Sequence, residues 1–145
     1  MAAIETIDVT IQTGDVSNAG TDGDVYLGIL GREFHLDSSS DDFERGSVRT
    51  YKLGVGANIT RKELNDPRNP QLDTVDLNKN PTKSDPTQNY KFPVYIRFEG
   101  DDHWNLVFVN VEVGGTGYGV SFPKGLWLGP DSGKICYLRE GRFGE

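Results

Sequence analysis

The chain has little cysteine, little histidine and no long apolar run, and each shortage excludes a class of protein. A single cysteine, Cys136, excludes an internal disulfide framework and a metal site built from several cysteines. No run of about 18 apolar residues is present, so no membrane-spanning helix is expected. The first residues lack the basic and apolar segments of a signal peptide. The compartment stays open: cytoplasmic, peripheral to a membrane, or secreted by another route.

Basic residues are also in the minority. The sequence has 22 Asp and Glu against 15 Lys and Arg, a formal net charge of −7. Nucleic-acid binding needs a basic surface, so no nucleic-acid partner is expected. An anionic lipid surface would also repel this chain unless cations intervened.

Short alternating apolar segments dominate what is present. A length of 145 residues suits one domain, which we expect to span 1–145. Glycine-rich turns separate segments with the period of half-buried strands, and this pattern predicts an all-β sandwich or barrel of seven or eight strands. The expected strands are 7–13, 25–31, 33–36, 50–55, 93–99, 105–113, 120–128 and 134–139.

Residues 56–91 break this pattern. They contain four prolines, six asparagines and few apolar residues. We interpret them as a polar surface insertion that supplies no core strand and is partly ordered by turns. Ile59–Asp66 is the one helix candidate in the chain. Asn58–Thr60 matches a glycosylation sequon, which we interpret as a chance match because no secretory signal is present.

Four segments resemble the PLAT/LH2 domain, the β-sandwich found in lipoxygenases, polycystins, pancreatic-type lipases and clostridial alpha-toxin. They are TGDVSNAGTDGDVYLGILG (13–31), LDSSSDDFERGSVRTYKL (36–53), VYIRFEGDDHWNLVFVNVEV (94–113) and SFPKGLWL (121–128). Together they cover a little under half of the chain, in the family's order. The resemblance implies an eight-stranded antiparallel sandwich of two four-stranded sheets, close in plan to C2 domains. The insertion at 56–91 departs from the family pattern.

Three acidic loops lie within or between these segments: Asp15–Asp24, Asp37–Asp42 and Asp101–Asp102. Calcium takes six to eight oxygen ligands from carboxylates, amides, backbone carbonyls and water. Loops at one end of a sandwich can bring such groups together, so the spacing is compatible with a calcium site. The alternative is that these aspartates are ordinary solvated turn residues.

The resemblance also implies which residues would hold calcium, because some PLAT domains bind it in corresponding loops. One site would use Asn18, the Gly20 carbonyl and Asp102, with the His103 carbonyl as a further candidate. A neutral amide at position 18, where the family site has an acid, should weaken affinity, and Asp22 or Asp101 could compensate. The other site would use Asp37, Ser38, the Ser40 carbonyl and Asp42.

No catalytic constellation is evident, and we predict that the chain is not an enzyme. Nucleophile elbows, zinc-protease motifs and phosphate loops are absent from the sequence. Cys136 is expected to pack as a small apolar group. His35 is expected in a strand and His103 in a turn. Trp104 and Trp127 could anchor a membrane, but we expect both to pack within the sandwich.

These observations favour a calcium-modulated module that binds lipid or membranes. The alternative is a protein-interaction module that docks a partner through its insertion. Carbohydrate binding also stays open, since sandwich faces with tryptophan and tyrosine accept sugars, although no aromatic ladder stands out in the sequence.

Overall fold

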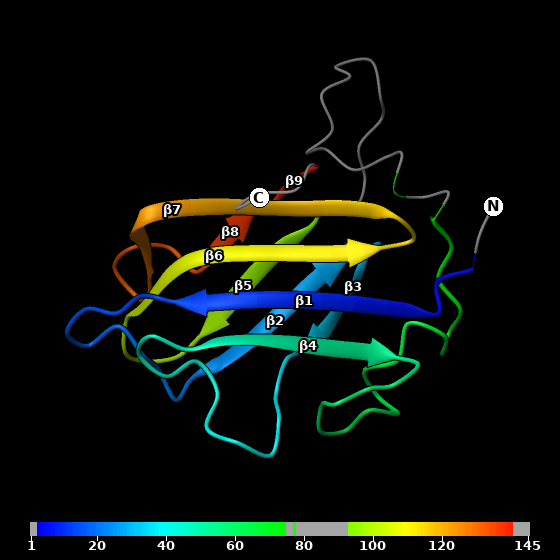
Figure 1. Cartoon of the computed structure of the whole chain (residues 1–145), viewed down its shortest axis with the longest axis horizontal. Coiled ribbons are helices and arrows are strands. Elements are labelled where there is room, and N and C mark those ends of the chain that lie inside the picture. The colour runs from blue at the N-terminus through cyan, green and yellow to red at the C-terminus, as the bar shows by residue number, and fades with distance from the viewer. Residues whose placement is uncertain (1–2, 75–76, 78–92, 141–145) are drawn as a thin grey trace.

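Two antiparallel sheets pack face to face in the computed structural model, which describes residues 3–74, 77 and 93–140 (Figure 1). In order across the first sheet lie β4 (Val48–Gly54), β1 (Thr6–Thr13), β6 (Trp104–Val113), β7 (Thr116–Leu128) and β9 (Arg139–Glu140). In order across the second lie β3 (Arg32–His35), β2 (Asp24–Ile29), β5 (Tyr95–Glu99) and β8 (Ile135–Tyr137). The predicted all-β sandwich is confirmed.

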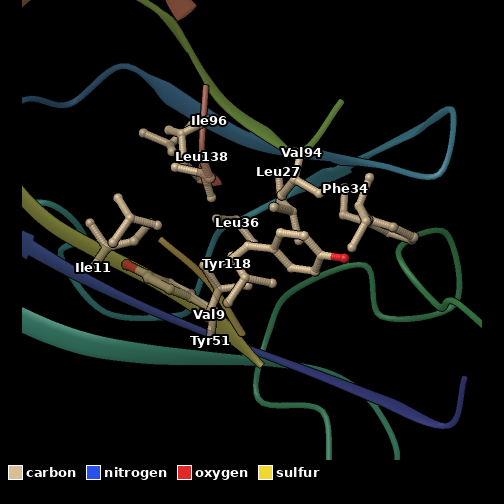
Figure 2. Close-up of a cluster of buried hydrophobic side chains, with 14 of the residues drawn as sticks. Val9, Ile11, Leu27, Phe34, Leu36, Tyr51, Val94, Ile96, Tyr118 and Leu138 are labelled. Carbon is tan, nitrogen blue, oxygen red and sulfur yellow. The ribbon is translucent and has the colours of Figure 1, made fainter. Parts of the chain in front are cut away.

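The core forms where the inward side chains of the two sheets meet. In β1 the residues alternate strictly, and Ile7, Val9 and Ile11 are buried while their neighbours are half-buried. Figure 2 shows Val9 and Ile11 in the same cluster as Leu27 and Ile96 of the opposite sheet. A period of two therefore sends one face of each strand into the core and leaves the other face for interactions outside it.

All eight predicted strands are present, and the sheets differ from the expected plan by one strand. Arg139 and Glu140 form the short strand β9, which pairs with Gly119 and Tyr118 of β7. The first sheet therefore has five strands rather than four. A two-residue strand has too little alternation to be detected in a sequence.

The predicted helix at Ile59–Asp66 is wrong, because this segment forms turns. Arg61 has a φ of 49°, which no right-handed helix accommodates. The Asn65 side chain also donates to the Arg61 carbonyl at 3.1 Å, a local bond that competes with helix continuation. Among the described residues, no helix is long and apolar enough to cross a membrane.

The first part of the predicted insertion covers one open side of the sandwich. The Asn58 side chain bonds to the edge of β4, where its amide accepts from the Lys52 N–H at 2.8 Å and donates to the Thr50 carbonyl at 3.0 Å. The Asn65 side chain likewise bonds to β3, where its amide oxygen accepts from the His35 N–H at 2.8 Å. Ile59 between them is buried. Residues 56–74 contain no strand, and residues 75–76 and 78–91 of the predicted insertion lie outside the described part.

Candidate functional site

The three acidic loops lie near one another on one side of the sandwich, toward the lower left in Figure 1. The β1–β2 loop is tied to the others by backbone hydrogen bonds. The Asn105 N–H donates to the Ala19 carbonyl at 3.0 Å, and the Thr21 N–H donates to the Phe43 carbonyl at 3.1 Å. The Gly46 N–H donates to the carbonyl at position 14 at 2.9 Å. Aspartates far apart in sequence are thereby held on one surface.

Gly20 occupies a point where two of these loops are in backbone contact. A Cβ added there would lie 2.8 Å from the Arg45 nitrogen and 3.1 Å from the Phe43 carbonyl oxygen. Any other residue would push the β1–β2 and β3–β4 loops apart. Asn18, two residues earlier, has a φ of 63°, a left-handed conformation that asparagine accepts more readily than most residues.

The residues of the first predicted set surround one hollow. Asn18, Gly20 and Asp102 line it together with His103 and Trp127. Thr21 donates its hydroxyl to Asp102 Oδ1 at 2.8 Å, which fixes the orientation of this carboxylate. Residues with amide, carbonyl and carboxylate oxygens therefore border a common space, and oxygen donors of these kinds are the type that calcium prefers.

Three residues of the second predicted set also line one hollow, but Ser38 does not line it, and Asp42 is already engaged by other side chains. Asp37, Ser40 and Asp42 line this hollow with Asp22 and Asp41 among others. Asp42 Oδ1 accepts from the Ser38 hydroxyl at 2.7 Å, the Tyr51 hydroxyl at 2.8 Å and the Arg49 guanidinium at 2.6 Å. Asp42 Oδ2 accepts from the Ser38 N–H at 2.8 Å.

These bonds determine the charge state of Asp42. Burial opposes ionisation of this carboxyl, but the hydrogen bonds from Ser38, Tyr51 and Arg49 outweigh burial and lower its pKa below the ordinary value. The Arg49 guanidinium already neutralises the charge. Asp42 is thus a structural anion at the base of the loop and does not fit the role of a calcium ligand without losing these partners.

Asp37 differs from Asp42 because only one of its two carboxylate oxygens accepts a hydrogen bond in the described structure. Asp37 Oδ2 accepts from the Thr60 hydroxyl at 2.7 Å. Across residues 3–74, 77 and 93–140, no group of three or more His, Cys, Asp or Glu side chains is close enough to hold a metal ion. A cation at this end must therefore draw on amide, hydroxyl, backbone and water oxygens as well as carboxylates.

Comparison with known proteins identifies the fold. The family model of the PLAT/LH2 domain matches residues 7–138.

This chain belongs to the PLAT/LH2 domain family.

The relatives of this PLAT domain are much longer proteins. Lipoxygenase homology domain-containing protein 1 of Mus musculus is 31% identical over 140 residues, which are 90% of this chain and 6% of that protein. Alpha-toxin from Clostridium absonum has a TM-score of 0.58 at 24% identity, with 94% of this chain and 32% of the toxin covered. Coral 8R-lipoxygenase, described as activated by calcium through a C2-like domain, has a TM-score of 0.59 at 19% identity, with 97% and 18% covered.

The two tryptophans of this PLAT domain have opposite environments. Trp104 is buried as predicted, and its indole N–H donates to the Thr13 hydroxyl at 2.9 Å. The prediction that Trp127 also packs inside is wrong, because 37% of it is exposed. Alternation along β7 sends Leu128 into the core and leaves Trp127 on the outer face, beside the hollow of Asn18 and Asp102. Val16 on the neighbouring loop is also exposed.

The one cysteine and the two histidines, considered above as possible reactive groups, have different surroundings in the structure. Cys136 is buried and packs as the predicted small apolar group, and this burial raises the pKa of its thiol to about 11. His35 lies in β3 as predicted, and its ring stacks on Tyr26 with centroids 5.0 Å apart. His103 Nε2 lies 4.0 Å from Asp131.

Sequence reasoning missed three residues that shape the site: Thr21, Arg49 and Tyr51. Thr21 lies in the first acidic loop but has no charge, and Arg49 and Tyr51 lie in β4 rather than in a loop. Arg49 and Tyr51 contribute through side chains that extend from β4 to the Asp42 carboxylate in the loop. The one available signal was the basic residue at position 49 shortly after the Asp37–Asp42 cluster.

Proposed function

We propose that this PLAT domain is a calcium-modulated module that binds membrane lipid, without catalytic activity of its own. The observation that carries the proposal is the position of exposed Trp127 at the hollow lined by Asn18, Gly20 and Asp102. An oxygen donor set and an indole ring are thereby combined on one surface. Indole prefers the membrane interface, where its ring is buried and its N–H stays hydrated.

Asn18, Gly20 and Asp102 would hold the ion through an amide oxygen, a backbone carbonyl and a carboxylate. Calcium, when bound, would supply the positive charge that an acidic surface lacks and could accept phosphate oxygens from lipid headgroups. The Thr21 hydroxyl, which donates to Asp102 Oδ1, holds this carboxylate in place beside the hollow. Trp127 and Val16 would add apolar contact with the interface.

The coral 8R-lipoxygenase neighbour supports the assignment of calcium, because calcium activation through a C2-like domain is described for that enzyme. The donor set in this chain has fewer carboxylates than a high-affinity site requires. We therefore propose weak calcium binding, in the range used by extracellular modules rather than by cytosolic buffers.

The test is co-sedimentation with vesicles that contain phosphatidylserine, in millimolar calcium and in chelator. We expect pelleting in calcium alone, with loss in Asp102→Asn and reduction in Trp127→Ala. Glu63→Gln is the matched control, because this exposed residue lies in the turns of 56–74 away from the loops. Equal pelleting with and without calcium would refute the proposal.

Docking of a partner protein through the insertion stays a prediction. In the described part of the insertion, Asn58, Ile59 and Asn65 cover the sandwich rather than project from it. No contact there favours a partner, so we do not advance this function as a second proposal.

A further inference from the structure

The outer face of the second sheet carries an unusual set of rings. Strand register places Tyr26 opposite both His35 of β3 and Arg97 of β5, and places Tyr95 opposite Tyr137 of β8. These side chains alternate with the core residues of the same strands, so they share the face that points away from the core. We call this surface the aromatic face, defined by Tyr26, Glu33, His35, Tyr95, Arg97, Glu99, Ile135 and Tyr137.

The rings of the aromatic face are packed into fixed orientations. Tyr26 has its ring against His35 and has the Arg97 guanidinium carbon 4.3 Å from its centroid. Tyr95 meets Tyr137 edge to face, with centroids 6.0 Å apart. A Cβ added at Gly28 would overlap the Tyr95 ring, so this glycine lets the ring lie directly on the backbone of β2.

The charged groups of the same face neutralise one another. Arg97 forms a two-point pair with Glu33, with both contacts at 2.9 Å, and donates to Glu99 at 2.6 Å. Lys134 lies 3.4 Å from Glu99. Tyr95 donates its hydroxyl to Glu33 at 2.6 Å. The charges therefore cancel locally, while the carboxylates and guanidinium stay partly exposed and held in place.

Cross-strand pairing explains part of this arrangement, because such pairs stabilise a sheet without any ligand. It includes the Tyr95–Tyr137 pair, but it leaves much of the outer strand β8 uncovered. Ile135 and Tyr137 are 44% and 57% exposed, and they extend the platform to the edge of the sheet. Two large apolar side chains in water beside a rigid ring indicate a surface that contacts something else.

We propose that the aromatic face binds a neutral glycan. A pyranose ring has an apolar C–H face that stacks on tyrosine and has hydroxyls that bond to carboxylate and guanidinium groups. The cancelled charges favour a neutral ligand: a phosphate-rich membrane or an acidic polysaccharide would require unpaired cations. A partner protein would need a pocket to receive an anchoring side chain. The aromatic face is a platform of four strands, which suits an extended chain of sugars better.

The proposed roles differ among the residues. Tyr95 and Tyr137 would stack on successive sugar units, and Glu33 and Glu99 would accept hydrogen bonds from hydroxyls. Arg97 would act as a positioning residue that holds both carboxylates. Gly28 would keep the Tyr95 ring against β2, with the Tyr137 ring inclined to it by 65°, so that the two rings form a bent platform. No bond forms or breaks.

The test is native gel electrophoresis in chelator, through gels that contain hydroxyethylcellulose, xyloglucan, laminarin, galactomannan or soluble starch, with alginate as the anionic control. We expect at least one neutral polymer to retard the protein. We expect Tyr137→Ala to weaken that binding about tenfold and Tyr137→Phe, which keeps the ring, to retain it. Trp127→Ala removes an exposed ring from the other sheet and should have no effect.

Four results would overturn the proposal: no retardation in any neutral gel, retardation by alginate alone, unchanged binding in Tyr137→Ala, or equal weakening in Trp127→Ala. A concentration-dependent doubling of mass that Tyr137→Ala abolishes would assign the face to a second copy of this chain and would also reject a glycan. Because calcium and lipid are absent from this experiment, its outcome is independent of the vesicle test.

Discussion

Arg49 donates to the Asp42 carboxylate at 2.6 Å and thereby ties strand β4 to the loop that precedes it. Tyr51, two residues along the same strand, donates its hydroxyl to the same oxygen at 2.8 Å. The loop therefore has a charged anchor with several donors, although it looks like a solvated acidic turn in the sequence.

Replacing Asp42 should destabilise the fold. Asp42→Asn removes the charge but keeps the shape, which leaves the Arg49 cation unpaired at the protein surface and weakens the other bonds. We expect a loss of about 1–3 kcal/mol in the free energy of unfolding, measured by urea denaturation. Asp41→Asn, at the exposed neighbouring position, is the control and should change stability little.

The same group should make stability depend on acid. The pKa of Asp42 in the folded state lies below its unfolded value, so its contribution is complete above the unfolded pKa and is lost as pH falls through the folded pKa. The difference in stability between the native protein and Asp42→Asn should therefore shrink as pH drops below about 4. Urea titrations at a series of pH values measure it; a constant difference down to the folded pKa would contradict the assignment.

Calcium should raise the melting temperature, because a ligand that binds only the folded state stabilises it. At about ten times the dissociation constant we expect a rise of about 4 °C. Asp102→Asn should abolish the rise. Asp42→Asn should melt lower yet retain it, because Arg49 already occupies that carboxylate. If Asp42→Asn abolished the calcium-induced rise in melting temperature and Asp102→Asn did not, calcium would not bind at Asp102.

The side chain of Asn58 should protect the edge of β4. Asn58→Ala leaves the Lys52 N–H and the Thr50 carbonyl without their partner and exposes a strand edge that can pair with another chain. We expect a loss of about 1–2 kcal/mol in unfolding free energy and faster aggregation on mild heating. Denaturation and light scattering measure these two effects. Asn69→Ala is the control in the same segment. An equal loss of unfolding free energy in Asn69→Ala would show that the contact of Asn58 with the β4 edge does not cause the effect.

Much of the fold could be predicted because its signals are local. Ile7, Val9 and Ile11 alternate as a half-buried strand must, and the core has this alternation. The helix prediction failed at Arg61, where a left-handed backbone conformation interrupts a segment of moderate helix propensity. Strand β9 was missed since its two residues are defined only by their pairing with β7.

The loops were harder to interpret than the strands. Asn18, Gly20 and Asp102 could be grouped from the resemblance, and the structure brings them to one hollow. The difference between Asp37 and Asp42 could not be predicted, because it depends on which donors reach each carboxylate. The aromatic face was invisible for a similar reason. Its tyrosines are spread from position 26 to position 137, and strand register alone makes them neighbours.

The contrast between Trp104 and Trp127 also gives this domain two intrinsic optical probes. Trp104, enclosed beside Phe43 and Phe98, should emit at short wavelength and resist quenching by acrylamide until the sandwich opens. Trp127 should emit at longer wavelength and be quenched readily in the native state. One unlabelled sample can therefore report unfolding through the first fluorophore and events at the loop end through the second.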